Sequence, residues 1–267
     1  MTWRYVPAVA VLLLAIAARP IAPHDPSEIH GEHTLESPTL QFPLGTDPLG
    51  RCVLSQALYA TSTSFGLALL ATVLSAAAGL IVGLAGGYFG SWGDLGFRVL
   101  SNVGLALPTL VVTLAVVAIL GPGWVNLLLA LSLSAWVRYA MVARDITRAQ
   151  MSLGFVVASR ALGASDWWIL RRHILPEVVR PTLILAALGL GSSMLSISAI
   201  SFLGLGISPP IFEWGTMLNS ARPYLNTTPR LLAIPGIAIV LTVGAFTLLA
   251  EELRERGTLF SRYSRAQ

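Results

Sequence analysis

Three histidines lie among carboxylates in the first part of the chain and could together bind a metal ion. They are His24, His30 and His33, and the residues between them include Asp25, Glu28 and Glu32. Imidazole nitrogens and carboxylate oxygens are ligands that Ni²⁺ or Zn²⁺ accepts. The spacing matches no defined zinc motif. A solvated polar loop is therefore the simpler interpretation, and a metal site is the weaker alternative.

The basic residues of this chain are all arginine. The sequence has 17 basic residues and contains no lysine. A P-loop uses a lysine to reach the terminal phosphates of a nucleotide, and Schiff-base catalysis uses a lysine amine. Both functions are therefore excluded for this chain alone. Cys52 is the only cysteine, which excludes an internal disulfide bond.

The elements that must position these residues are long apolar segments. Hydrophobic residues make up 55% of the chain, charged residues only 11%, and the mean hydropathy is +0.73. A membrane-spanning helix needs about 20 mostly apolar residues. The sequence therefore predicts an all-α membrane protein with about six transmembrane helices. They are expected at 3–18, 59–87, 95–120, 124–142, 181–205 and 231–250, and the first could alternatively be a cleaved signal peptide.

The apolar segments lack the groups that ion-driven carriers use. Residues 99–137, 181–212 and 231–250 contain no charged residue and no histidine. A proton or Na⁺ needs a carboxylate or an imidazole at membrane depth. Transport must therefore draw its free energy from elsewhere, or the protein is a passive pore. A membrane enzyme is disfavoured for the same reason, because no cluster of catalytic side chains lies within the spans.

The distribution of arginine predicts the orientation in the membrane. Six spans place thirteen of the 17 arginines on the side of both termini, which the positive-inside rule makes the cytoplasmic side. Membrane topology explains this bias better than nucleic-acid binding does. The expected parts are a first helix (1–19), an extracytoplasmic segment (20–56), a five-helix transmembrane core (57–251) and a cytoplasmic tail (252–267). The core includes an inner loop (143–180) and an outer loop (206–230).

The inner loop predicts two short helices joined by a sharp turn. A helix is expected over 156–162, and Gly163 suits its C-terminal stop. Ser165 or Asp166 can cap a second helix that runs to Pro176. This second helix carries both tryptophans and arginines, so the loop either lies on the membrane surface or docks a soluble partner.

Small residues and prolines within the spans predict packing and bending. Glycine allows helices to approach closely, and several glycines fall in the second and fifth spans, which suggests helix–helix contacts. They are Gly79, Gly83, Gly86, Gly87, Gly189 and Gly191. Pro108 and Pro235 are expected to kink the helices that contain them.

Four motifs together resemble a known family of transport proteins. Residues 157–163 (Val-Ala-Ser-Arg-Ala-Leu-Gly), followed by Ile-Leu-Pro at 174–176, are similar to the EAA loop of permease subunits of bacterial ABC importers. Residues 45–51 (Gly-Thr-Asp-Pro-Leu-Gly-Arg), 201–206 (Ser-Phe-Leu-Gly-Leu-Gly) and 213–218 (Glu-Trp-Gly-Thr-Met-Leu) resemble the dipeptide, oligopeptide and nickel group of these permeases. Val157, Ser159 and Cys52 depart from the group, which has Glu, Ala and Asp there.

The resemblance implies a subunit of the bacterial cytoplasmic membrane rather than an enzyme. Such a permease pairs with a second, homologous permease chain around a central pathway in the lipid bilayer. Two ABC ATPase subunits bind ATP and Mg²⁺ and dock on the inner loops, so this chain itself needs no cofactor. An extracytoplasmic binding protein delivers the solute. Short peptides are the preferred solute, with nickel or a metal chelate as the alternative; a standalone channel or secondary carrier is the alternative of another class.

The expected site residues fall into two groups, with no catalytic residue among them. The ATPase-coupling residues implied by the resemblance are Val157, Ala158, Ser159, Gly163, Ala164, Ser165, Asp166, Arg171, Ile174 and Pro176. The expected translocation pathway is weakly polar, since a passage for varied peptides needs few fixed charges. Its candidates are Ser101, Asn102, Pro108, Thr109, Ser192 and Ser196.

Overall fold

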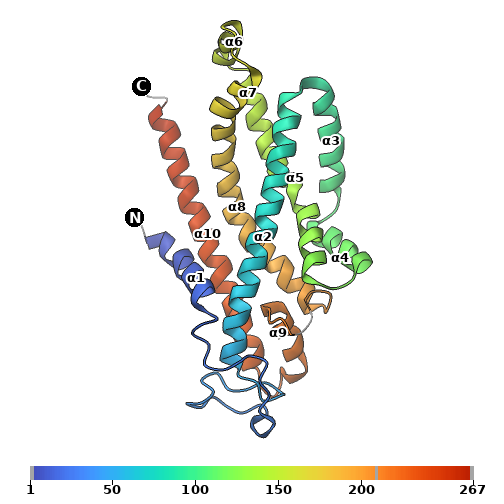
Figure 1. Ribbon diagram of the computed structural model, residues 1–267, viewed down its shortest axis with the longest axis vertical. Coiled ribbons are helices and arrows are strands. Elements are labelled where there is room, and N and C mark those ends of the chain that lie inside the picture. Colours follow the sequence, from blue (N-terminus) through green and yellow to red (C-terminus); the bar gives the residue numbers. More distant parts are fainter. Residues whose placement is uncertain (1–2, 208–209, 265–267) are drawn as a thin grey trace.

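The computed structural model describes residues 3–207 and 210–264, and every regular element within them is a helix (Figure 1). The ten α-helices of this part of the chain are α1 (Val6–Ala17), α2 (Val53–Tyr88), α3 (Gly90–Ala106), α4 (Thr109–Leu120), α5 (Trp124–Met151), α6 (Gly154–Ala161), α7 (Asp166–Ile169), α8 (Leu175–Phe202), α9 (Trp214–Ala221) and α10 (Arg230–Ser264). Short 3₁₀ segments are η1 (Trp3–Tyr5), η2 (Gly31–His33) and η4 (Arg222–Tyr224), and η3 (Leu170–Ile174) is a π-helical segment.

The predicted membrane spans all fall on helices, although two of them differ from the expectation. In the described residues, four helical stretches are long and apolar enough to cross a bilayer: Val53–Tyr88, Trp124–Met151, Asp166–Phe202 and Arg230–Glu255. The span expected at 95–120 is instead two helices, α3 and α4, that meet at an angle of 85°. Helix α1 has 12 residues, about 18 Å of helix, so it is shorter than the ~30 Å hydrocarbon core.

The bend between α3 and α4 has a local cause. Leu107 is extended, with φ −116° and ψ 144°, and Pro108 caps α4. Proline disfavours the helical conformation of the preceding residue because its ring clashes with that residue. The kink predicted at Pro108 is therefore a complete break of the helix. Pro235, in contrast, lies inside α10, which continues through it.

The tightest packing is between α2 and α5, and glycines make it possible. A Cβ atom on Gly79 would lie 2.5 Å from the carbonyl oxygen of Trp136, and one on Gly87 would lie 2.7 Å from the Cβ of Thr147. Gly83, between them, faces Ala140 in the same way. These residues recur every four positions and form one face of α2. The packing role predicted for these glycines is thus confirmed.

The two ends of the helix bundle are different in construction. Helices α6 and α7 project at one end, on the same side as the C-terminus, and we call this the hairpin end (Figure 1). Helix α9 and the segment that joins α1 to α2 lie at the opposite end, which we call the α9 end (Figure 1). The first and last helices are joined by an ion pair of 2.8 Å between Arg4 and Glu255. The expected inner and outer loops therefore lie at opposite ends.

The segment before α2 is ordered by polar contacts rather than by regular structure. The side chain of Arg230, at the start of α10, donates to the carbonyl oxygens of Leu35 and Glu36. Gly45 has φ +74°, which a residue with a side chain rarely adopts. Helix α2 begins at Val53, four residues before the expected boundary of the transmembrane core at 57.

Candidate functional site: the α6–α7 hairpin

The turn between α6 and α7 depends on a glycine with a left-handed backbone. Gly163 has φ +86°, directly after the last residues of α6. Its N–H donates to the carbonyl of Arg160 at 2.9 Å, and the N–H of Ala164 donates to the carbonyl of Ser159 at 3.0 Å. These bonds satisfy the carbonyl groups that the end of a helix leaves unpaired. The predicted stop at Gly163 is confirmed.

The second helix of the hairpin starts as predicted but does not end as predicted. The Ser165 side chain accepts a hydrogen bond from the N–H of Trp168, at 3.3 Å, and so caps α7. The prediction that this helix ends at Pro176 is wrong, because α7 continues through η3 into α8. In η3 the N–H of Leu175 bonds to the carbonyl of Leu170, five residues earlier. Pro176 lies in the first turn of α8, where its missing N–H is tolerated.

A buried apolar cluster anchors the hairpin to the bundle. Val156 of α6, Ile169 of α7 and Ile174 of η3 are fully buried, and they pack with Ala143 of α5 and Val178 of α8. Leu80 and Leu84 of α2 and Ile146 of α5 pack against this cluster. Since the cluster joins α2, α5 and α8, a displacement of the hairpin must also move these helices.

The opposite face of the hairpin exposes large apolar side chains. The exposed fraction is 64% for Val157, 89% for Leu162 and 68% for Trp167. Phe155 and Trp168 extend this surface. Several large apolar side chains exposed on one short hairpin indicate an interaction site for a protein or a membrane.

The expected coupling residues are divided between these two faces. Ile174 is buried in the anchor, and Ser159 and Ala164 are half-buried. The others are exposed: Val157, Ala158, Gly163, Ser165, Asp166, Arg171 and Pro176. The hairpin therefore brings them together in one structure, although only the exposed ones can meet a partner directly.

An ion pair across the turn was not foreseen from the sequence. The Arg160 Nε atom lies 3.0 Å from the Asp166 Oδ1 atom, so the pair bridges α6 and α7 over Gly163. This hydrogen bond to Asp166 raises the pKa of Arg160 above its ordinary value. Tyr88, the last residue of α2, interacts electrostatically with both groups. The available signal was the predicted turn at Gly163, which brings the end of the first short helix beside the start of the second.

The expected pathway residues lie on two separate parts of the fold. Ser101 is buried on α3 and Asn102 is exposed beside it, whereas Pro108 and Thr109 form the bend before α4. Ser192 and Ser196 lie on α8, where the Ser196 hydroxyl donates to the carbonyl of Ser192. Helix α8 packs on α2, α5, α9 and α10, whereas α3 packs on α2 and α5, and α4 packs on α5. The two groups thus lie on different helices that share α5 as a neighbour.

The three histidines surround a phenylalanine and form no ready-made metal site. The rings of His24, His30 and His33 lie 5.1–5.5 Å from the ring of Phe42. His33 also forms a 2.6 Å contact with Glu36. In residues 3–207 and 210–264, no group of three metal-ligating side chains is placed to hold an ion.

Sequence reasoning also missed a buried carboxylate beside the spans. Glu213 comes directly after the uncharged segment 181–212, and its side chain is completely buried. Its oxygens accept hydrogen bonds from Ser64 of α2, Ser198 of α8 and the N–H of Thr216 in α9. Burial raises the pKa of Glu213 above its ordinary value, because desolvation disfavours the charged form. Its position at the start of the 213–218 motif was the available signal.

Comparison with known proteins shows extensive similarity to transport components. Residues 75–257 match the family model described as "Binding-protein-dependent transport system inner membrane component". A glutathione transport system permease protein of Pectobacterium atrosepticum is 36% identical over 92% of this chain and 82% of its own length. A nickel transport system permease protein of Escherichia coli is 35% identical over 91% of this chain and 88% of its own length. A di/tripeptide transport system permease protein of Pseudomonas aeruginosa is 34% identical over 92% of this chain and 83% of its own length.

Proposed function

Because the chain belongs to the family of binding-protein-dependent transport system inner membrane components, we propose that it forms half of the translocation pathway for short peptides in an ATP-driven importer. The chain is a multi-pass permease of the bacterial inner membrane. The observation that carries the proposal is the α6–α7 hairpin, which is exposed on one face and anchored to α2, α5 and α8 on the other.

The hairpin is the proposed contact with the ATPase subunits. The complex has two such subunits, which bind ATP and Mg²⁺ in place of this lysine-free chain. One of them docks on the exposed side chains of Val157, Leu162 and Trp167, and the other docks on the second permease. Docking buries apolar surface, which stabilises the complex by roughly 25 cal/mol for each Å² removed from water. Movement of the ATPases then reaches the spans through Val156, Ile169 and the rest of the anchor. On this proposal the hairpin end and both termini are cytoplasmic.

A second, homologous permease chain completes the pathway. The pathway residues on α3 and α4 and those on α8 lie on separate parts of the chain, and a partner permease supplies the facing surfaces. Exposed apolar side chains on both helices of the bent pair, such as Val99 and Val103 of α3 and Val111 of α4, are available for this contact. On this proposal an extracytoplasmic binding protein brings the solute to the α9 end, and the dependence of the family on a binding protein supports such a partner.

Short peptides are the preferred solute, and nickel is the second candidate. Relatives named for glutathione and for di- and tripeptides favour a peptide, and a relative of equal similarity named for nickel favours the metal ion. The candidate pathway side chains are hydroxyls and an amide, with no fixed charge, which suits peptides whose side chains vary. The histidines at the α9 end add no support for nickel, because no three ligating side chains in the described residues are grouped to hold an ion.

Reconstitution tests the proposal. The complex is purified through a tag on this chain, and its subunits are identified by mass spectrometry. It is then placed in liposomes with ATP, the binding protein and a panel of di- and tripeptides, glutathione, free Ni²⁺ and nickel chelates. We expect an ATPase and a second permease to co-purify, and ATP-dependent uptake of peptides. Uptake by this chain alone without ATP would refute the importer and support a channel or carrier.

A further inference from the structure

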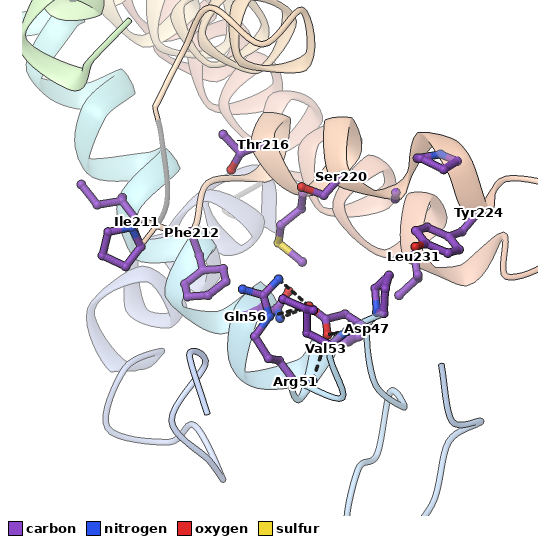
Figure 2. A pocket seen from close by; sticks show the side chains of 16 residues that line it. Asp47, Arg51, Val53, Gln56, Ile211, Phe212, Thr216, Ser220, Tyr224 and Leu231 are labelled. Atoms are coloured by element: carbon purple, nitrogen blue, oxygen red, sulfur yellow. Dashed lines mark hydrogen bonds and ion pairs between the residues drawn. The ribbon is translucent and has the colours of Figure 1, made fainter. Parts of the chain in front are cut away.

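A pocket at the α9 end is separate from the proposed pathway residues and from the hairpin. It has a volume of about 350 Å³ and lies between the start of α2, the segment before it, α9 and η4. Figure 2 shows Thr216 and Ser220 of α9 on one side of the pocket, Phe212 on another, and Tyr224 and Leu231 opposite. Its volume fits a few side chains of another molecule rather than a folded segment.

The acidic group of the pocket has no capacity for a further partner. The Asp47 Oδ1 atom accepts from the N–H groups of Leu49 and Arg51, both at 2.9 Å. Its Oδ2 atom accepts from Arg51 Nε at 2.6 Å and from Gln56 Nε2 at 2.8 Å. A carboxylate offers about four acceptor sites, and these bonds occupy them. Since only 7% of the Asp47 side chain is exposed, the pocket does not attract cations through it.

The basic group of the pocket, in contrast, has donors to spare. Arg51 contacts Asp47 through its Nε and Nη2 atoms, whereas a guanidinium carries five N–H donors. Its side chain is 21% exposed, and its guanidinium carbon lies 5.5 Å from the centre of the Phe212 ring. Ser220 is exposed on the same pocket. The pocket therefore offers positive donors beside an apolar wall, which is the chemistry that recognises a carboxylate next to an apolar group.

The far side of α9 is fastened to the membrane-spanning helices. Glu213 binds Ser64 of α2 and Ser198 of α8, and the Asn219 amide donates to the carbonyl of Phe202 at 2.5 Å. A side chain on Gly215 would collide with the backbone of Ser198. An occupant of the pocket thus touches a helix that is held to α2 and α8, and these two helices carry the hairpin anchor at their other end.

From these contacts we propose that the pocket receives a projection of the extracytoplasmic binding protein, in which an apolar side chain stands beside an aspartate or glutamate. The carboxylate pairs with Arg51, and the apolar side chain packs against Phe212 and α9. The inference rests on the proposed function, because that function places the α9 end on the extracytoplasmic side of the membrane. Docking in this pocket could also influence the ATPases, because α9 is held to α2 and α8, and these two helices contact the hairpin anchor.

Filling the pocket tests the proposal. Ser220→Trp adds a large ring to the pocket and leaves the contacts of Asp47 in place, and Asn226→Trp is its control, since Asn226 is exposed at the same end but does not line the pocket. The assay is the ATPase rate of the purified complex against the concentration of solute-loaded binding protein. We expect the half-saturating concentration to rise about tenfold in Ser220→Trp, equivalent to about 1.4 kcal/mol, and to be unchanged in Asn226→Trp. Equal half-saturating concentrations of the binding protein for Ser220→Trp and Asn226→Trp would overturn the proposal.

Two further arms identify the occupant. Arg51→Gln should weaken stimulation and reduce its sensitivity to ionic strength, because a charged contact is lost. A photo-reactive benzoylphenylalanine at Ser220 should cross-link the purified binding protein. Cross-linking to the second permease, or blocking of the cross-link by free dipeptide, would assign the pocket to another occupant and refute the proposal. Failure of the proposed function would be evident earlier, as a complex that contains no ATPase.

Discussion

Gly163→Ala changes the backbone preference of the hairpin turn and leaves the other residues of the hairpin unchanged. Gly163 has φ +86°, and no atom lies within 4 Å of the position that its Cβ would occupy. The substitution therefore causes no steric collision, and its cost comes only from the left-handed backbone, about 1–2 kcal/mol. A cost of this size shifts the equilibrium between the native turn and other loop conformations by roughly 5- to 30-fold.

Gly154→Ala is the matched control for this experiment. Gly154 begins α6, also has no atom within 4 Å of the position that a Cβ would occupy, and has no positive φ. Alanine there favours the helix by up to about 1 kcal/mol. The two variants add the same methyl group to opposite ends of the same short helix, so that only the backbone requirement differs.

The assay is the number of peptides transported for each ATP hydrolysed in proteoliposomes, together with the affinity of the membrane complex for its ATPase subunits. We expect Gly163→Ala to lower both quantities by roughly the 5- to 30-fold population shift. The unfolding temperature of the spans should change little, because Gly163 itself is exposed and has open space where its Cβ would lie. Gly154→Ala should behave as the wild type. If Gly163→Ala transports and binds its ATPases normally, the turn does not position the docking surface and the reasoning is refuted.

Three other substitutions test separate parts of the structure. Ala158→Arg places a long charged side chain on the exposed face of α6, so it should weaken ATPase binding about tenfold or more without changing thermal unfolding. Gly83→Leu forces a side chain into Ala140 of α5, and it should destabilise the fold by about 1–3 kcal/mol, measured as a lower unfolding temperature in detergent. Glu213→Gln tests the raised pKa of the buried carboxyl. Above the ordinary pKa of 4.5 the folded protein still holds this proton, whereas the unfolded chain loses it. Wild-type stability should therefore fall as pH rises from 4.5 to the raised pKa, and the stability of the variant should lose this dependence on pH.

A specific result would contradict each of these three predictions. Ala158→Arg with unchanged ATPase affinity would place the docking surface elsewhere on the hairpin. Gly83→Leu with wild-type stability would contradict the close contact of α2 and α5, and Gly66→Leu is its control, because Gly66 of α2 has open space around it. If wild type and Glu213→Gln show the same dependence of unfolding temperature on pH across the range from the ordinary pKa to the raised one, another group is responsible for it.

Much of the hairpin could be predicted because its determinants are local. Gly163 stops α6 through its own backbone preference, and Ser165 caps α7 through a bond to Trp168, three residues later. The extension past Pro176 could not be predicted in the same way. A proline usually signals the end of a helix, but here the wider π-helical turn at 170–174 precedes it and the helix continues.

The sequence by itself determined which segments form long apolar helices at 53–88, 124–151, 166–202 and 230–255, the sharp turn of the inner loop and the exclusion of a P-loop. These depend on the length of apolar runs, on single-residue backbone preferences and on the missing lysine, all of which are independent of the rest of the fold. Only the tertiary structure decided that Glu213 bonds to Ser64, 149 residues away, and that Asp47 leaves Arg51 as the available charge of the outer pocket. The first of these contacts joins distant residues, and the second joins residues four positions apart whose burial and spare hydrogen-bond capacity become known only when the surrounding helices are in place.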